Sequence, residues 1–248
     1  MPPAKALSLD DPRLRQALTS RSVVCLTGAG ISAESGIPTF RGPDGLWKRF
    51  RPEELANFDA FLANPELVWE WYRYRRDKIG SAQPNAGHRA LAAWQDRGPG
   101  EFHLITQNVD GLHQRAGSRD VIELHGNIWN DRCLECGRMQ ESDSSEVAGV
   151  PQCECGGKMR PDVVWFGEFL PEAKLEKSFD LAAACEVFLL VGTSAVVQPA
   201  AGLPVLAKRN GACLIEVNPE PTPLSDRADF NFFAPAGEVL PRLLEAGS

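Results

Sequence analysis

The 248-residue sequence lacks three features that would assign it to common classes of protein. Its longest apolar run, around Val187–Val191, is far shorter than the roughly 20 residues of a membrane-spanning helix. No long run of basic residues appears and the net charge is −7, which argues against a nucleic-acid-binding surface. The first twenty residues show neither a secretion signal nor the acid-free, arginine-rich pattern of an organelle transit peptide. We therefore expect a cytoplasmic monomer, with no membrane and no direct nucleic-acid partner.

Hydrophobic residues make up 43% of the chain and charged residues 24%, as in ordinary globular proteins. Short β-branched and apolar runs alternate with stretches of helical spacing, which is the pattern of a parallel sheet covered on both faces. The predicted strands are Ser22–Thr27, Phe102–Thr106, Val121–Leu124, Glu186–Val191, Ala212–Val217 and Phe230–Phe233. The predicted helices are Pro65–Ile79, Ala86–Asp96, Pro171–Cys185, Pro199–Arg209 and Gly237–Ala246. The sequence therefore predicts an α/β protein built on a doubly wound sheet.

Two segments interrupt this alternation, Gly42–Gly80 and Asn127–Arg160, and together they predict a small second domain. The second segment holds two close cysteine pairs, Cys133-x-x-Cys136 and Cys153-x-Cys155, each beside glycine. Four thiolates at this spacing suit one tetrahedral zinc, with no open position for chemistry. A redox Cys-x-x-Cys would not need the second pair, and four unrelated thiols would not be spaced in this way. We expect the other three cysteines to be buried and unreactive: Cys25, Cys185 and Cys213.

A glycine-rich loop, Gly28-Ala29-Gly30, follows the first predicted strand directly. Small residues between a strand and a helix allow a pyrophosphate to approach backbone N–H groups, so this loop is a candidate dinucleotide site. A plain tight turn would also explain the glycines. Ala33 occupies the place of the third glycine in the usual dinucleotide motif, so an ordinary dehydrogenase is not favoured.

Polar residues also follow other predicted strands. Gly192-Thr193-Ser194 and Asn218-Pro219-Glu220 come after two of them, and Thr106–Asp110 after a third. Ligands of open α/β sheets bind beyond the carboxyl ends of strands, so these segments could converge on one nucleotide, although polar loops follow most strands. His125 ends another strand beside a glycine, where it could act as a general base or be structural. We expect structural roles for the remaining histidines, His88, His103 and His113.

The sequence resembles the sirtuin family along nearly its whole length. The resemblance rests on the four-cysteine cluster and on five segments in family order: Gly28–Gly42, Thr106–His113, Leu124–Gly126, Val163–Glu168 and Gly192–Ser194. The resemblance implies a Rossmann-like NAD-binding large domain, residues 1–42, 81–126 and 161–248, and a small helical and zinc-binding domain, residues 43–80 and 127–160. The second cysteine pair, with one residue between its two cysteines, resembles that of the class III branch.

The resemblance also implies which residues act. NAD and an acyl-lysine peptide would enter the cleft between the domains, with the acyl group passing to ADP-ribose and nicotinamide released. His125 would be the catalytic base, and Asn108 and Asp110 would hold the nicotinamide end. The implied NAD site consists of Gly28, Ala29, Gly30, Phe40, Arg41, Trp47, Gln107, Asn108, Asp110, Gly192, Thr193, Ser194, Asn218, Glu220 and Ala236. Substrate backbone would pair with Val164, Trp165, Phe166 and Gly167.

Tyr72 and Arg75 stand three residues apart in a predicted helix, so they share one face. An amphipathic helix with its arginines in water would explain the same pattern. The spacing also resembles the Tyr-x-x-Arg pair with which class III sirtuins hold the carboxylate of succinyl-, malonyl- or glutaryl-lysine, and Ala56 is the small residue expected beside it. The sequence therefore predicts a preference for these acyl groups over acetyl.

Other functions remain open at this stage. A deacetylase proper and a mono-ADP-ribosyltransferase could use the same scaffold, although a transferase has less need of His125. A non-catalytic metabolite sensor would be expected to lack some catalytic positions, and none is missing. A zinc-ribbon nucleic-acid module is disfavoured by the acidic charge.

Overall fold

The computed structural model describes residues 11–40, 55–142 and 149–245. Its main element is a six-stranded sheet with the order β3-β2-β1-β7-β8-β9, in which every neighbouring pair is parallel. The strands are β1 (Ser22–Thr27), β2 (Glu101–Thr106), β3 (Ile122–Glu123), β7 (Val187–Val191), β8 (Cys213–Val217) and β9 (Phe230–Phe232). The chain leaves β1 toward one edge of the sheet and returns at β7 to build the other. The topological switch therefore lies between β1 and β7.

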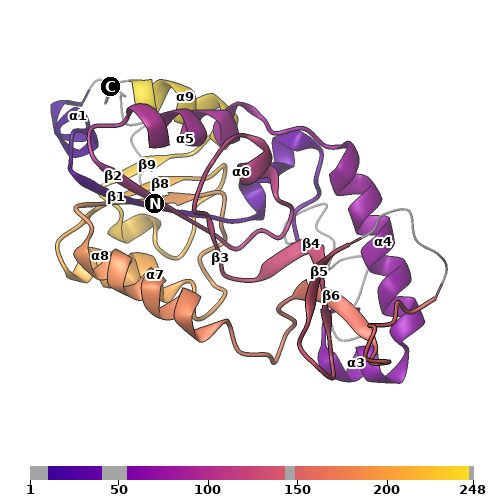
Figure 1. The fold of residues 1–248 in the computed structure, drawn as a ribbon. Helices are drawn as coiled ribbons and strands as arrows, with labels where there is room; N and C mark the ends of the chain where they lie inside the picture. The colour runs from indigo at the N-terminus through magenta and orange to yellow at the C-terminus, as the bar shows by residue number, and fades with distance from the viewer. Residues whose placement is uncertain (1–10, 41–54, 143–148, 246–248) are drawn as a thin grey trace.

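Helices cover both faces of this sheet because its central strands are buried on both sides (Figure 1). One face packs against α1 (Pro12–Leu18), α5 (Ala86–Arg97) and α9 (Ala236–Glu245) through residues such as Leu91 and Leu240. The opposite face packs against α7 (Glu172–Ala184) and α8 (Gly202–Arg209) through Leu203 and others. Three short helices complete this unit: η1 (Ala29–Ser35), α6 (Leu112–Arg115) and η3 (Ser225–Arg227).

A second, smaller unit lies beyond one end of the large sheet, at the right of Figure 1. It contains an antiparallel sheet of β4 (Gly126–Cys133), β5 (Met139–Glu141) and β6 (Met159–Val163), with β4 in the centre. The helices α3 (Phe58–Ala63) and α4 (Pro65–Ser81) belong to the same hydrophobic cluster, in which Trp69 and Met159 are fully buried. The Trp69 indole nitrogen donates to the Met159 carbonyl, 3.1 Å away, and ties α4 to β6.

These two units confirm the predicted fold class of a Rossmann-like parallel sheet with a small cysteine-bearing second domain. All six predicted strands and all five predicted helices are present, with small shifts at their ends. The prediction that α8 begins at Pro199 is wrong, because residues 199–201 first form turns and the helix starts at Gly202. The predicted division at residues 42–43 lies outside the described residues. Within the described ranges, no helix is long and apolar enough to cross a membrane.

A buried ion pair joins α4 to β4. The Arg76 guanidinium is 2.6 Å from an Asp131 carboxylate oxygen, and both side chains are less than a tenth exposed. The Nε of Arg76 also donates to the Ile128 carbonyl at 2.7 Å. Charges removed from water in this way are tolerated only when they are paired and hydrogen-bonded, so each partner depends on the other.

Replacing Arg76 with methionine should therefore lower the free energy of unfolding by about 3–5 kcal/mol, because it leaves the Asp131 carboxylate buried without compensation. Adding Asp131→Leu should restore part of this loss. Urea denaturation followed by tryptophan fluorescence would measure both changes. The surface pair of Arg119 and Asp96 is the control: with both side chains more than half exposed, Arg119→Met should cost less than about 1 kcal/mol. Equal losses for the two arginines would contradict the assignment.

Candidate functional site at the switch point

The loops that follow β1 and β7 touch through their backbones. The Gly30 N–H donates to the Gly192 carbonyl at 2.7 Å, and the Gly28 N–H donates to the Val191 carbonyl at 3.0 Å. A Cβ atom on Gly30 would lie 2.6 Å from the Gly192 oxygen, and one on Gly28 would lie 2.8 Å from the Thr193 Cβ. The glycines are therefore required by this close approach, and not only by a local turn. Ala29, between them, is the first residue of η1, which is a 3-10 helix.

The loop after β2 joins the same cluster. The Gln107 side chain donates to the Thr193 hydroxyl at 3.0 Å, which connects this loop to the loop after β7. The Asn108 side chain donates to the Ser32 hydroxyl at 3.2 Å, and Ser32 donates to the Asp110 carboxylate at 2.7 Å. The structure therefore brings together polar groups from the carboxyl ends of β1, β2 and β7.

Asp110 is almost fully buried and accepts two hydrogen bonds, one from Ser32 and one from the Leu112 backbone N–H at 2.9 Å. Burial raises the pKa of this carboxyl, although the hydrogen bonds oppose the shift. The Nε2 atom of His88 lies 3.4 Å from the Ser32 hydroxyl, and burial lowers the pKa of His88 to about 4. Sequence reasoning missed the contacts of Ser32 and His88 with this network. The available signal was the Asn85–His88 capping box at the start of α5, which faces the glycine loop.

The ring of His125 has a defined orientation. Its Nδ1 lies 2.9 Å from the Gln107 carbonyl oxygen. Because a carbonyl only accepts hydrogen bonds, Nδ1 carries the hydrogen in the neutral ring, and Nε2 keeps an unprotonated lone pair. Burial lowers the pKa of His125 below its ordinary value, and the bond to Gln107 partly opposes this. The ring can therefore accept a proton at neutral pH.

The remaining predicted nucleotide contacts lie after β7, after β8 and at the start of α9. The Asn218 side chain donates to the Glu220 carbonyl at 2.6 Å in the loop after β8, and Ser194 is exposed after Thr193. Ala236 is buried at the start of α9, where the next N–H, that of Gly237, donates to Glu34 of η1 at 2.7 Å. No described contact links Asn218 or Glu220 to the glycine loop. Arg41 and Trp47 lie outside the described residues.

Tyr72 and Arg75 point into the interior from α4, and both are less than a tenth exposed. The Arg75 guanidinium carbon lies 4.9–5.5 Å from three aromatic ring centres: Phe40, Trp71 and Tyr72. Burial lowers the pKa of Arg75 and raises that of Tyr72. Within the described ranges no carboxylate forms an ion pair with Arg75. The alternative of an amphipathic helix with its arginines in water is therefore wrong for Arg75, and for Arg76 as well.

The predicted substrate segment already has protein partners along one edge. The Val164 N–H donates to the His125 carbonyl and the Phe166 N–H donates to the Ala56 carbonyl, both at 2.9 Å. Phe166 also forms a parallel bridge with Asn57. Its side chain is 51% exposed, and Gly167 follows with a positive φ of 86°. The Trp165 side chain, by contrast, is buried. An added strand would have to pair with the other edge.

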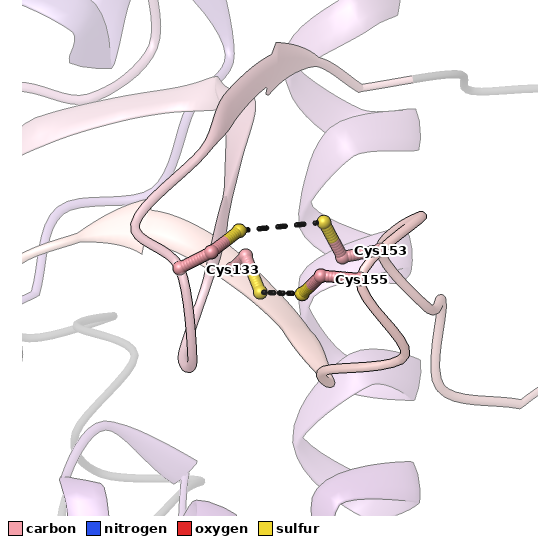
Figure 2. A group of neighbouring side chains, drawn as sticks. Cys133, Cys153 and Cys155 are labelled. Atoms are coloured by element: carbon pink, nitrogen blue, oxygen red, sulfur yellow. Dashed lines mark hydrogen bonds between the residues drawn. The ribbon is translucent and has the colours of Figure 1, made fainter.

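Four cysteine sulfurs of the small unit converge (Figure 2). Cys133 and Cys155 are 3.5 Å apart, Cys136 and Cys153 are 3.7 Å apart, and all four sulfurs lie within 4.8 Å of one another. A tetrahedral zinc with Zn–S bonds of ~2.3 Å requires sulfurs about 3.8 Å apart, so the donor set fits one such ion. Hydrogen bonds from backbone N–H groups, chiefly that of Cys136, lower the pKa of the Cys133 thiol, which favours the thiolate that a metal binds.

Comparison with known proteins then decides the family. The model of the Sir2 family matches residues 28–199, from the glycine loop to the loop after β7. The chain is a sirtuin. It is 56% identical over 226 residues to a protein of Aquifex aeolicus named NAD-dependent protein deacylase, covering 90% of this chain and 94% of that one.

Two solved structures are also similar to this sirtuin. One is described as a Sir2 homolog–NAD complex, with 49% identity, a TM-score of 0.90, and coverage of 96% of this chain and 93% of the other. The second is a Sir2 variant with a deacetylated p53 peptide and 3′-O-acetyl ADP ribose, with 37% identity, a TM-score of 0.83, and coverage of 95% and 97%. The predicted family is therefore confirmed, whereas the individual roles of the predicted residues remain predictions.

Replacing Cys153 with alanine in this sirtuin should release zinc and unfold the small unit, because a missing ligand forfeits binding energy that also stabilises the fold. Metal analysis of the purified protein should show close to one zinc per wild-type chain and a strong loss in the variant. Cys213→Ala is the matched control, since Cys213 lies on β8 of the large sheet and should leave the zinc content unchanged. A full zinc content in the Cys153→Ala protein would exclude this ligand set.

Proposed function

We propose that this sirtuin is an NAD-dependent protein-lysine deacylase that prefers succinyl-, malonyl- or glutaryl-lysine to acetyl-lysine. Support for the general reaction comes from relatives. Several proteins with the name NAD-dependent protein deacylase are 49–56% identical to this chain. Similar solved structures hold NAD in one case and a deacetylated peptide with an acetyl ADP-ribose in another. The observation that carries the acyl preference is the buried guanidinium of Arg75 beside the Tyr72 hydroxyl.

The loops at the switch point suit NAD as the cosubstrate. Gly28 and Gly30 leave the loop after β1 without side chains at the contact with Gly192, and these loops lie where open α/β sheets bind nucleotides. In our proposal, Asn108 and Asp110 hold the nicotinamide end, where Ser32 fixes both side chains by hydrogen bonds. The bound NAD supplies the ribose that accepts the acyl group and the nicotinamide that leaves.

His125 is the proposed general base on the ribose hydroxyls. The Gln107 carbonyl fixes its neutral tautomer, and the lowered pKa keeps the ring unprotonated at neutral pH. The His125 carbonyl accepts the N–H of Val164, the first residue of the proposed substrate segment. The backbone of the proposed base is therefore bonded directly to the segment proposed to hold the substrate.

The proposed acyl pocket follows from the cost of burying Arg75. Removing a guanidinium from water costs several kcal/mol unless an anion pairs with it. The three aromatic rings around Arg75 each return only about 0.5–2 kcal/mol. A carboxylate at the end of an acyl chain would meet the planar fork of Arg75 with two hydrogen bonds, and Tyr72 could add a third. An acetyl group offers no such carboxylate.

Replacing His125 with alanine should preserve NAD binding while lowering kcat by ~10²–10⁴, the usual contribution of a general base. In the wild type, the rate should fall as the pH drops through the lowered pKa of His125, below its ordinary 6.5, and should stay level at neutral pH. Calorimetry with NAD and a kcat–pH profile would measure these effects.

His103→Ala is the control for this experiment, because His103 lies on β2 with a part-exposed side chain near Glu101 and should be dispensable. A His125→Ala protein that kept more than about a tenth of the wild-type kcat would show that His125 is structural.

Replacing Arg75 with methionine should lower kcat/KM for a succinyl-lysine peptide by roughly 10- to 150-fold, the value of one charge-assisted hydrogen bond in a dry site. The Arg75→Met variant should still deacetylate a peptide of the same sequence that carries acetyl-lysine. The measurement is a mass-spectrometric assay of matched acyl-lysine peptides with and without NAD.

Arg73→Met is the matched control on the same helix, because the Arg73 guanidinium lies against Trp69 and donates to the Gly149 carbonyl, away from Tyr72. Equal losses on both acyl groups in Arg75→Met would mean that Arg75 supports the helix and not the substrate. A wild-type preference for acetyl-lysine would refute the acyl pocket and favour a deacetylase proper.

A further inference from the structure

The Tyr72 hydroxyl lies in an almost completely buried position, with the side chain only 1% exposed. It forms a hydrogen bond with the indole nitrogen of Trp165, 2.8 Å away. An indole N–H can only donate, so the Tyr72 oxygen must accept this bond. The hydrogen of the Tyr72 hydroxyl then has to point elsewhere, and the adjacent Arg75 offers donors alone. Within the described part of the chain, no group accepts that hydrogen.

The Trp165 side chain is itself held from several sides. The Arg160 guanidinium carbon lies 3.4 Å from the centre of the indole ring, and the Phe61 ring centre is 5.3 Å away. Glu168 pairs with Arg160 and also accepts the Trp165 backbone N–H at 2.8 Å. Both the ring and the backbone of Trp165 are therefore fixed, so the direction of its N–H bond is defined by β6 and the loop that follows it.

We infer that Trp165 determines acyl specificity by a positioning role: its indole N–H occupies the acceptor side of the Tyr72 hydroxyl and directs the hydroxyl hydrogen toward an acidic acyl group. This inference rests on the proposed acyl pocket and extends it to the side chain of a residue whose backbone belongs to the proposed substrate segment. Burial raises the pKa of Tyr72, so the hydroxyl keeps its hydrogen at neutral pH and can donate.

Removing the N–H while keeping a ring in place tests the inference. Trp165→Phe retains an aromatic face for Arg160 and Phe61. It should lower the ratio of desuccinylation to deacetylation, each as kcat/KM on the same peptide, by about 3- to 10-fold, the effect of one hydrogen bond. Tyr72→Phe should lower the ratio at least as far. The double variant should then lose little more than Tyr72→Phe, because Trp165 acts through the hydroxyl.

Two further variants separate positioning from packing. Substituting Trp165 with benzothienylalanine, in which sulfur replaces the indole N–H, preserves the ring shape and should reproduce the change in ratio even where Trp165→Phe folds poorly. Trp94→Phe is the control for a buried indole: Trp94 lies on α5 in the large unit, and its ring nitrogen has no hydrogen-bond partner among the described residues. It should leave the ratio unchanged.

The outcomes distinguish this inference from the function on which it rests. If both Trp165 variants keep the succinyl preference of the wild type, the proposed role of Trp165 is wrong and the acyl pocket is unaffected. Full additivity of Trp165→Phe with Tyr72→Phe, or equal losses on succinyl and acetyl substrates, would likewise assign Trp165 to packing. A wild-type protein without succinyl preference would overturn the pocket and this inference together.

Discussion

The backbone contact between the loops after β1 and β7 is the constraint on which the site depends. A side chain at Gly30 would place its Cβ within 2.6 Å of the Gly192 oxygen, so the two loops can meet only where both are glycine. Their meeting fixes the start of η1, and η1 carries Ser32 to the point where Asn108 and Asp110 converge. One close approach at the topological switch thus orders polar groups from three strand ends, with no charged residue needed to hold the loops together.

The large sheet could be predicted from the sequence because its central strands are buried on both faces and appear as unbroken apolar runs. The strands of the small unit carry no such signal. β5 is exposed at all three positions, and β6 contains Arg160, Pro161 and Asp162, which lower strand propensity. The two cysteine pairs lie close to these strands in the sequence. Their spacing indicates a metal site, but it does not indicate which residues around them form strands.

Within the site, the sequence predicts which polar residues follow the strands. It does not predict which side chains from other elements contact them. His125 and Asp110 stand at strand ends that the sequence marks clearly. Ser32 and His88 meet only because α5 packs against η1, and no local pattern encodes that contact. The residue pattern alone also did not reveal the burial of Arg75 and Arg76, because arginines alternating with aromatics are typical of an amphipathic helix. Only the family resemblance directed Arg75 toward a pocket. Each guanidinium is tolerated inside the protein by partners distant in sequence, aromatic faces for Arg75 and Asp131 for Arg76.

His125 also joins the two units of the molecule. Its ring is bonded to the Gln107 carbonyl of the large unit, and its own carbonyl accepts the N–H of Val164 just beyond β6 of the small unit. The next residue, Gly126, has a φ of 81° and passes so close to Asp162 that a Cβ would lie 2.0 Å from its carbonyl oxygen. The chain therefore passes from the large unit to the small unit at a residue that has no room for a side chain. The imidazole is therefore anchored to both units within two consecutive residues, so a change in the angle between the units would also change the orientation of the proposed base.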